Sequence, residues 1–218
     1  SALAGSADRT PVTIDQHPDV RRMLWRMRAQ TEAARALIYY STAQTDFGHL
    51  GDEDAATRAE VLIPLAKAHA TDIGCEVASL GIQVHGGMGF IEETGAAQHY
   101  RDARIAPIYE GTNGIQAADL VGRKLGLAGG AAVRSLIDDI ARDAKDHKAL
   151  ANLTETCRQV TDYMVGASMP DRLAGSYPYL TMLSTAPCGW LLLKQRRAAA
   201  ADLETGTGDS AFLTGKIA

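Results

Sequence analysis

The 218-residue sequence has few of the features that mark membrane, secreted or nucleic-acid-binding proteins. Its longest runs of large apolar residues, such as residues 190–193, are four residues long, whereas a membrane-spanning helix needs roughly twenty. No basic segment followed by an apolar one stands near its start, so we expect no secretory signal peptide. The net charge of −4 and the pI near 5.8 argue against a nucleic-acid binder, which normally carries a basic patch.

Reactive and metal-binding patterns are also scarce. The three cysteines, Cys75, Cys157 and Cys188, stand far apart and form no C-x-x-C pair. Their odd number and wide spacing predict buried free thiols in a reducing compartment, so we expect a cytoplasmic protein. The six histidines form no H-x-x-x-H pair, which argues against a metal site. The absence of G-x-S-x-G removes the strongest signal for a serine hydrolase.

Little in the sequence favours β-strands. Aromatic residues make up only 6%, and no stretch alternates apolar and polar residues. We therefore predict an all-α fold, with an antiparallel four-helix bundle followed by a smaller extension of three helices. Pro64 lies inside the second predicted helix, where we expect a kink or a later start. The predicted helices span residues 18–47, 53–84, 95–106, 113–125, 131–147, 150–166 and 177–204.

Helical periodicity assigns apolar residues to the inward faces of three of these helices. In the first helix they are Val20, Met23, Leu24, Met27, Leu37 and Ile38. In the second they are Leu62, Ile63, Ala66, Ile73, Val77 and Leu80, and in the fourth Ile115, Leu120, Val121 and Leu125. These faces are expected to form the core of the bundle.

Polar residues and glycines mark the predicted helix ends. Thr94 and Thr112 are candidate N-caps, because a threonine hydroxyl can accept a backbone N–H of the first turn. The run GLAGG at residues 126–130 is the strongest boundary candidate, and it predicts two domains, residues 1–127 and residues 128–218. From Thr205 on, glycine and threonine are frequent, so we expect this segment to fray.

Two irregular segments, residues 83–89 and 109–114, flank the short third helix. Their glycines let the backbone approach a ligand closely and adopt positive φ angles. The second segment also precedes a helix, whose free N–H groups and positive dipole end can receive an anion. Tight interhelical turns are the alternative interpretation, since neither segment carries a phosphate-binding lysine signature.

Glu110 is the most informative residue of these segments. It stands between Tyr109 and Gly111, after the apolar residues 105–108 and just before a helix N-cap. A carboxylate in such surroundings would be poorly solvated, which raises its pKa and suits it to act as a base. The alternative is a carboxylate near a helix start that interacts with the helix dipole.

Residues 82–125 closely resemble the C-terminal helical domain of acyl-CoA dehydrogenases. The resemblance rests on Q-x-x-G-G-x-G at residues 83–89, followed some twenty residues later by Y-E-G-T at residues 109–112. The helix that begins HPDVRRML is also similar to the family. Residues after Gly130 resemble the helical extension of a larger subgroup, which includes dehydrogenases acting on 3-methylthiopropanoyl-CoA as well as fatty acyl-CoA.

The resemblance implies an FAD-dependent dehydrogenation of an acyl-CoA thioester to the trans-2-enoyl-CoA. Glu110 matches the catalytic base that removes the α-proton, and its backbone N–H is expected to bind the thioester carbonyl. Tyr109 and Gly111 flank it in the substrate site. Thr112 and Asn113 match residues that close over FAD in their own subunit. Gln83, Val84, His85, Gly86 and Gly87 match the segment that contacts the FAD of a neighbouring subunit.

The family also implies a homo-oligomer, dimeric or tetrameric, and electron-transfer flavoprotein as the electron acceptor. Gly114 departs from the family, whose members usually carry Gln or Glu there. The family's amino-terminal helical domain and β-domain are not part of these 218 residues, so we expect a fragment that is inactive alone. The alternatives are a helical oligomerisation module without chemistry, an acyl-CoA oxidase, or a DNA-damage-response homologue.

Overall fold

The computed structural model describes residues 2–3 and 7–217, and within these it contains helices and no β-strand. The all-α prediction is therefore confirmed. The α-helices are α1 (Pro18–His49), α2 (Glu53–His85), α3 (Gly87–Phe90), α4 (Ala96–Ala103), α5 (Asn113–Gly122), α6 (Ala131–Asp143), α7 (Lys148–Gly166), α8 (Met169–Thr205) and α9 (Ser210–Ile217). The 3-10 helices are η1 (Ile14–Gln16), η2 (Glu92–Thr94) and η3 (Lys124–Gly130). None of the helices described is long and apolar enough to cross a membrane.

The chain packs as two compact units, and α1 and α2 contribute to both. Unit 1 comprises Ser1–Glu32 and Ala70–Glu110, and unit 2 comprises Ala33–His69 and Gly111–Ala218. Unit 1 therefore holds the start of α1, the end of α2, α3 and α4. Unit 2 holds the remainder of α1 and α2 together with α5 to α9.

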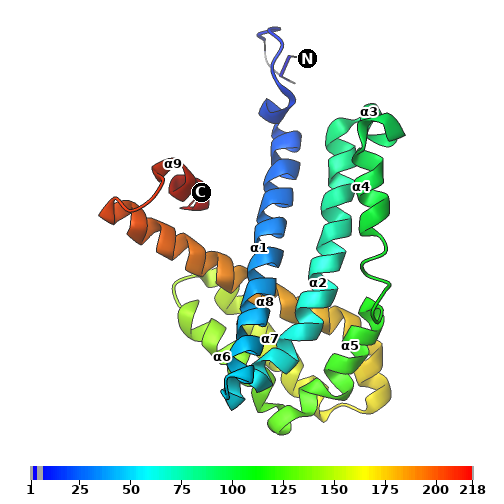
Figure 1. The fold of residues 1–218 in the computed structure, drawn as a ribbon, viewed down its shortest axis with the longest axis vertical. Coiled ribbons are helices and arrows are strands. Elements are labelled where there is room, and N and C mark those ends of the chain that lie inside the picture. Colours follow the sequence, from blue (N-terminus) through cyan, green and yellow to red (C-terminus); the bar gives the residue numbers. More distant parts are fainter. Residues whose placement is uncertain (1, 4–6, 218) are drawn as a thin grey trace. The chain divides into compact units, whose positions relative to one another are not determined.

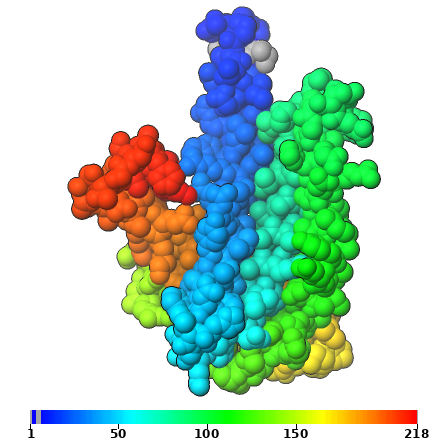
Figure 2. Space-filling model, viewed as in Figure 1, coloured from blue at the N-terminus to red at the C-terminus, as the bar shows by residue number. Residues whose placement is uncertain are grey.

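Within unit 1, residues of α2 contact both α1 and α4. Glu76 on α2 accepts a hydrogen bond from Gln30 at 3.1 Å and lies 2.5 Å from the guanidinium of Arg26, both on α1. Cys75 Sγ lies 3.4 Å from the carbonyl oxygen of Ala103 at the end of α4. In the space-filling view α4 lies along the C-terminal part of α2 (Figure 2).

Unit 2 contains the main hydrophobic core, in which α5 packs against α8, and α6 and α7 pack against each other and α8 (Figure 1). A fully buried large aliphatic side chain contributes about 1.5–3 kcal/mol relative to an exposed one. Because α5, α6 and α8 all contribute such residues, this core joins the predicted bundle to the predicted extension. Fully buried members are Leu37, Leu62, Leu65, Leu120, Val121, Leu125, Leu136, Ile137, Ile140, Leu180 and Leu183.

The second helix does not start late, although Pro64 lies inside it. It begins at Glu53, where Asp52 Oδ1 accepts the backbone N–H of Ala55 at 2.9 Å. Proline removes one helical hydrogen bond. Here the buried side chains of Leu62 and Leu65 on either side of Pro64 offset that loss. Of the two expected outcomes, the later start was therefore wrong, and the kink stays a prediction.

The eighth helix begins earlier than predicted, at Met169 instead of residue 177. Ser168 is its N-cap, with Oγ accepting the backbone N–H of Asp171 at 3.4 Å, and Pro170 occupies the first turn. Proline is tolerated there because the N–H it lacks has no helical partner in any case. Sequence periodicity alone did not reveal this capped start.

The prediction that the segment from Thr205 on frays was also wrong for residues 205–217, and Ala218 lies outside the described residues. A short segment after Thr205 leads into α9, whose first turn is capped by Asp209: Oδ1 accepts the backbone N–H of Phe212 at 2.9 Å. Leu213 is buried, and Lys216 donates to Gln195 of α8 at 3.2 Å. These contacts order the segment.

Of the two predicted threonine caps, one is confirmed. Thr112 accepts the backbone N–H of Ile115 at 3.2 Å and caps α5. Thr94 does not cap α4, because its hydroxyl donates to the carbonyl oxygen of Met88 at 2.6 Å. Gly95, with φ +78°, is the N-cap, and α4 ends at Ala103 instead of residue 106.

The predicted inward faces are partly wrong. Leu37, Leu62 and Leu120 are buried as expected, but four predicted inward residues are exposed. Apolar residues of α1 and α2 occupy more than one helical stripe, and periodicity does not show which stripe meets the core. The exposed residues are Leu24, Ile38, Ile63 and Ile115.

Candidate functional site

The glycine-rich segment turns the chain at the end of α2. Gly86 has φ +61° and ψ −143°, a conformation open essentially to glycine, and it links α2 to α3. A Cβ on Gly89 would lie 2.3 Å from the carbonyl oxygen of Ile82, so the backbone approaches itself too closely there for any side chain. The predicted tight turn is therefore real, whether or not a ligand also binds.

The residues assigned to FAD by resemblance lie largely on the surface of this turn. Gln83, His85, Gly86 and Gly87 are exposed, and Val84 is half-buried. No atom outside the immediate chain lies within 4 Å of a Cβ built on Gly86 or Gly87, so the space above these glycines is open. His85 Nδ1 lies 2.8 Å from the carbonyl oxygen of Gly81, which fixes the ring against its own helix.

A groove of about 460 Å³ runs beside this turn within unit 1. Helices α1, α2 and α4 contribute most of its walls. Small and apolar residues make up most of the lining, and the imidazole rings of His85 and His99 add polar atoms. The lining residues are Met27, Gly74, Val77, Ala78, Gly81, His85, Thr94, Ala96, His99 and Ala103.

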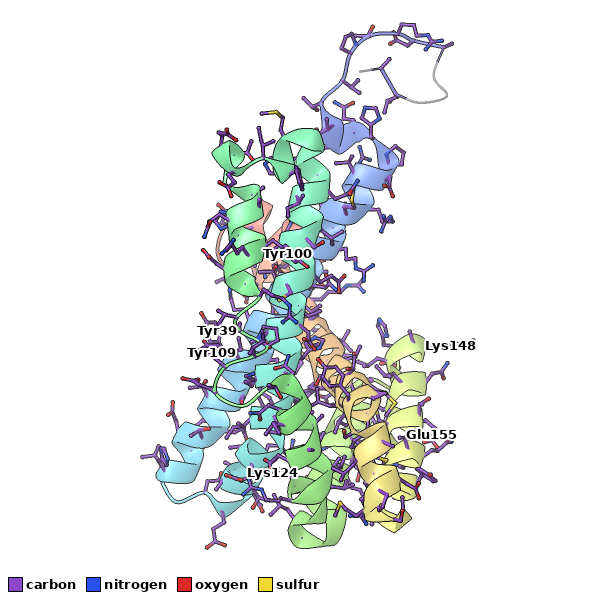
Figure 3. The ribbon with its side chains drawn as sticks, turned by 90° about the vertical axis from the view of Figure 1, so that its right-hand side faces the viewer. Tyr39, Tyr100, Tyr109, Lys124, Lys148 and Glu155 are labelled. Carbon is purple, nitrogen blue, oxygen red and sulfur yellow. The ribbon has the colours of Figure 1, made fainter. Side chains whose placement is uncertain are left out.

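The second segment, after α4, carries two consecutive residues in the left-handed region of backbone space. Glu110 has φ +52° and Gly111 has φ +83°. Glycine adopts this conformation without steric cost, but a glutamate does so only under strain. Tyr109, labelled in Figure 3 on this segment, is half exposed.

Glu110 is exposed in this chain, so the expectation of a poorly solvated carboxylate was wrong for these residues. The reason is that the neighbouring apolar residues Ile105 and Ile108 are themselves exposed and form no dry pocket around it. Exclusion of water favours the neutral form of a carboxyl group and so makes its carboxylate a better base. Nothing within the chain provides that exclusion at the described residues.

A lysine that the sequence did not single out holds the backbone after Glu110. Lys67 Nζ, on α2, donates to the carbonyl oxygen of Gly111 at 2.7 Å and to Asn113 Oδ1 at 2.9 Å. Asn113 is only 3% exposed, and its Nδ2 donates to the carbonyl oxygen of Ala68 at 3.1 Å. These contacts lie within unit 2 and tie residues 111–113 to α2.

These residues also define the start of α5. Thr112, exposed, caps the helix, and Asn113 is its first residue. A helix N-terminus carries a partial positive charge. The ammonium group of Lys67, bonded to Gly111 and Asn113, adds a full positive charge at this helix end. The arrangement suits an anionic group near residues 110–113.

Other chemistry is not supported by the described residues. Among the described residues, no group of three or more His, Cys, Asp or Glu side chains is placed so that it could hold a metal ion. Burial raises the pKa of Cys157 to about 11 and that of Cys188 to about 12, so both are protonated near neutral pH and unsuited to act as nucleophiles.

Comparison with known families and sequences agrees with this arrangement. A family model described as "Acyl-CoA dehydrogenase, C-terminal domain" matches residues 2–125, and one described as "Acetyl-CoA dehydrogenase C-terminal like" matches residues 131–218. A 3-methylmercaptopropionyl-CoA dehydrogenase of Ruegeria pomeroyi is 44% identical over 98% of this chain and 39% of its own length. A broad-specificity linear acyl-CoA dehydrogenase of Mycobacterium tuberculosis is 31% identical over 99% of this chain and 40% of its own length. The chain thus spans about two fifths of these relatives.

Solved structures share the fold. Caenorhabditis elegans ACDH-11, in complex with C11-CoA, superposes with a TM-score of 0.73 at 18% identity, over 84% of this chain and 34% of that one. An acyl-CoA dehydrogenase of Bacillus anthracis, complexed with FAD, superposes with a TM-score of 0.66 at 19% identity, over 94% of this chain and 40% of that one. At such identities the likeness establishes the fold alone. Since the first family model covers more than half of the chain, the chain belongs to the acyl-CoA dehydrogenase family.

Proposed function

We propose that this chain is the C-terminal part of an FAD-dependent acyl-CoA dehydrogenase that converts an acyl-CoA thioester to the trans-2-enoyl-CoA. The observation that carries the proposal is the Y-E-G-T segment at residues 109–112, where Glu110 is exposed in a strained conformation directly before a capped helix. Strained residues concentrate at functional sites because selection retains them there despite their cost. The family and the named activities of the relatives point the same way.

In this proposal Glu110 removes the α-proton of the thioester. An α-proton is acidic only while the adjacent carbonyl is polarised, and the backbone N–H of Glu110 would supply part of that polarisation as a hydrogen-bond donor. Tyr109 and Gly111 would border the acyl group. Exclusion of water on assembly of the complete site would strengthen the hydrogen bond from the Glu110 N–H to the carbonyl.

The residues proposed for FAD fit such a group. Gly86 and Gly87 offer exposed backbone with open space above it, which a flat ring or a phosphate can approach. Thr112 and Asn113 stand at the start of a ten-residue helix, whose positive end favours phosphate. The Asn113 side chain is engaged with Lys67 and Ala68, so its contribution would come from its main chain. When bound, FAD supplies the acceptor for the β-hydride.

We also propose that residues 1–127 and 128–218 are the two domains of this region, the second being the extension of the larger family subgroup. The separate family matches to residues 2–125 and 131–218 support this division. The two domains are not independent in packing, because Arg58 bonds Asp139 at 2.8 Å and Ser135 at 2.8 Å across the boundary.

The partners proposed are an acyl-CoA substrate, further copies of the chain and electron-transfer flavoprotein, with the cytoplasm as the compartment. The relatives named as dehydrogenases of 3-methylmercaptopropionyl-CoA and of linear acyl-CoA support the first. A relative from Acetobacterium woodii, named as subunit CarC of a caffeyl-CoA reductase–Etf complex, is 33% identical over 94 residues and supports the last. Exposed Ile38, Tyr39 and Phe47 on α1 offer apolar area for association between copies.

A second candidate substrate is 3-methylthiopropanoyl-CoA. The relative named for this thioester is 44% identical to the chain, whereas those named for butyryl-CoA or linear acyl-CoA are 31–34% identical over similar lengths. The candidate differs from straight-chain acyl-CoA by a sulfur in the chain. The chemistry proposed for Glu110 would be unchanged.

The test is Glu110→Gln in the full-length protein that carries this chain, purified with its flavin. We expect reduction of the flavin by butyryl-CoA and by 3-methylthiopropanoyl-CoA to be lost, while flavin content and helix content stay as in the parent. Asp138→Asn, at an exposed position on α6, is the matched control for loss of one carboxylate. Unchanged turnover of Glu110→Gln would refute the role of the base and favour a non-catalytic oligomerisation module.

A further inference from the structure

We propose that Lys67 is a positioning residue of the dehydrogenation site, which holds the main chain after Glu110 so that the carboxylate and N–H of Glu110 point in a fixed direction. Its effect on the reaction rests on the proposed function, whereas its effect on the backbone does not. No motif marks Lys67, because it lies 43 positions before Glu110 on a different helix.

The contacts of Lys67 converge on two of the three residues that follow Glu110, Gly111 and Asn113. Nζ donates to the carbonyl oxygen of Gly111 at 2.7 Å and to Asn113 Oδ1 at 2.9 Å. The neighbouring Ala68 accepts from Asn113 Nδ2 at 3.1 Å. One turn of α2 thus binds Gly111 and Asn113 through three hydrogen bonds, two of them from a charged donor. Hydrogen bonds from charged donors are shorter and about twice as strong as neutral ones.

The conformation of Glu110 requires stabilising contacts of this kind. At φ +52° the Cβ of a non-glycine residue crowds the following carbonyl oxygen, and the chain relaxes to another conformation unless its surroundings prevent this. Gly111, also left-handed, is flexible by nature and cannot impose a conformation on its neighbour. The carbonyl of Gly111 is the first acceptor after Glu110 that is tied to another helix, and Lys67 is the group that ties it.

The charge at this position is also informative. A helix N-terminus favours acidic neighbours, so an ammonium group beside the start of α5 is electrostatically unfavourable for the helix itself. A half-buried lysine further loses hydration. A purely packing role would be served by an apolar side chain of similar length. A lysine at this position is explained if its ammonium group holds the Gly111 carbonyl and favours negative charge near residues 110–112.

The first test measures the backbone and needs no cofactor. Amide hydrogen exchange of residues 109–116 is followed by mass spectrometry in the 218-residue chain, for the parent, Lys67→Met and Lys67→Arg. We expect this segment to exchange at least about tenfold faster in Lys67→Met than in the parent. The increase should be smaller in Lys67→Arg, which keeps the charge and the hydrogen-bond donors. Lys148→Met, at an exposed position on α7 (Figure 3), is the control for loss of one positive charge.

The second test measures the reaction in the full-length protein. We expect Lys67→Met to lower kcat by about ten- to a hundredfold with little change in KM, because a misaligned base affects the transition state more than substrate binding. Exchange of the α-proton of a bound thioester with solvent should slow by the same factor, and flavin content should not change. Lys67→Arg should recover part of kcat.

The outcomes separate the two proposals. Unchanged exchange of residues 109–116 in Lys67→Met overturns the positioning role, and so does unchanged kcat when Glu110→Gln is inactive. An active Glu110→Gln refutes the proposed base instead, and the exchange result then still decides whether Lys67 holds the backbone. If Lys67→Met does not fold by circular dichroism, Lys67→Gln, which is neutral and shorter, is measured in the same way.

Discussion

Replacing Trp190 by phenylalanine tests how the extension is joined to the bundle. Trp190, on α8, is almost fully buried, and its ring meets that of Tyr40 on α1 edge-on at a centroid distance of 5.4 Å. Its Nε1 donates to Asp143 Oδ2, at the end of α6, at 2.7 Å. Phenylalanine keeps an aromatic ring at this position and removes the N–H. The substitution therefore removes the hydrogen bond to Asp143 and leaves part of the site unfilled.

The structure sets the size of the effect. A hydrogen bond to a charged group contributes about 1.5–3 kcal/mol when both groups are buried. The Asp143 side chain is 36% exposed, so water can replace the lost donor, and we expect about 1 kcal/mol from this bond. The smaller ring leaves unfilled space beside Tyr40, which costs about another 1–2 kcal/mol. Trp190→Phe should thus lower the free energy of unfolding by about 2–3 kcal/mol.

The effect should depend on pH with a definite sign. The indole N–H lowers the pKa of Asp143 below its usual 3.8. A carboxyl group whose pKa is lowered by folding stabilises the protein above its unfolded pKa, and this contribution disappears as pH falls through the folded value. The destabilisation by Trp190→Phe should therefore be smaller at pH 3 than at pH 7.

Urea unfolding followed by circular dichroism measures these quantities. Trp190→Phe, Asp143→Ala and the double variant form a double-mutant cycle, for which we expect a coupling energy of about 1 kcal/mol at pH 7. Additive effects within about 0.3 kcal/mol would refute the hydrogen bond as a stabilising contact. An equal destabilisation at pH 3 and pH 7 would refute the stated origin of the Asp143 pKa.

The remaining predictions concern the glycine turn and the buried thiols. Gly89→Ala should destabilise the chain by about 1–3 kcal/mol, because the new Cβ would clash with the carbonyl oxygen of Ile82. Gly87→Ala should be nearly neutral, because the space around that position is open. Equal melting temperatures of the two variants would contradict this reasoning. Cys157 and Cys188, whose pKa values burial raises to about 11 and 12, should resist alkylation at pH 8 until the chain unfolds, as peptide mass spectrometry would reveal.

Much of the secondary structure could be predicted from local sequence. The starts of α1 and α2 and the cap at Thr112 agree with the sequence-based prediction, because helix starts and caps depend on contacts within one turn. The same reasoning failed at Thr94, whose hydroxyl found another carbonyl partner three to six residues away. Where two local partners compete, composition does not decide between them.

The sequence by itself determined that this chain is helical, which family it belongs to, and where Glu110 stands. These properties reside in the apolar period and in two motifs whose residues are close along the chain. Only the tertiary structure decided that Lys67 reaches Gly111, that Asn113 is buried, and that Glu110 is exposed. The physical reason is that a hydrogen bond between distant residues and the exposure of a side chain depend on which helices meet, and no period within one helix encodes that.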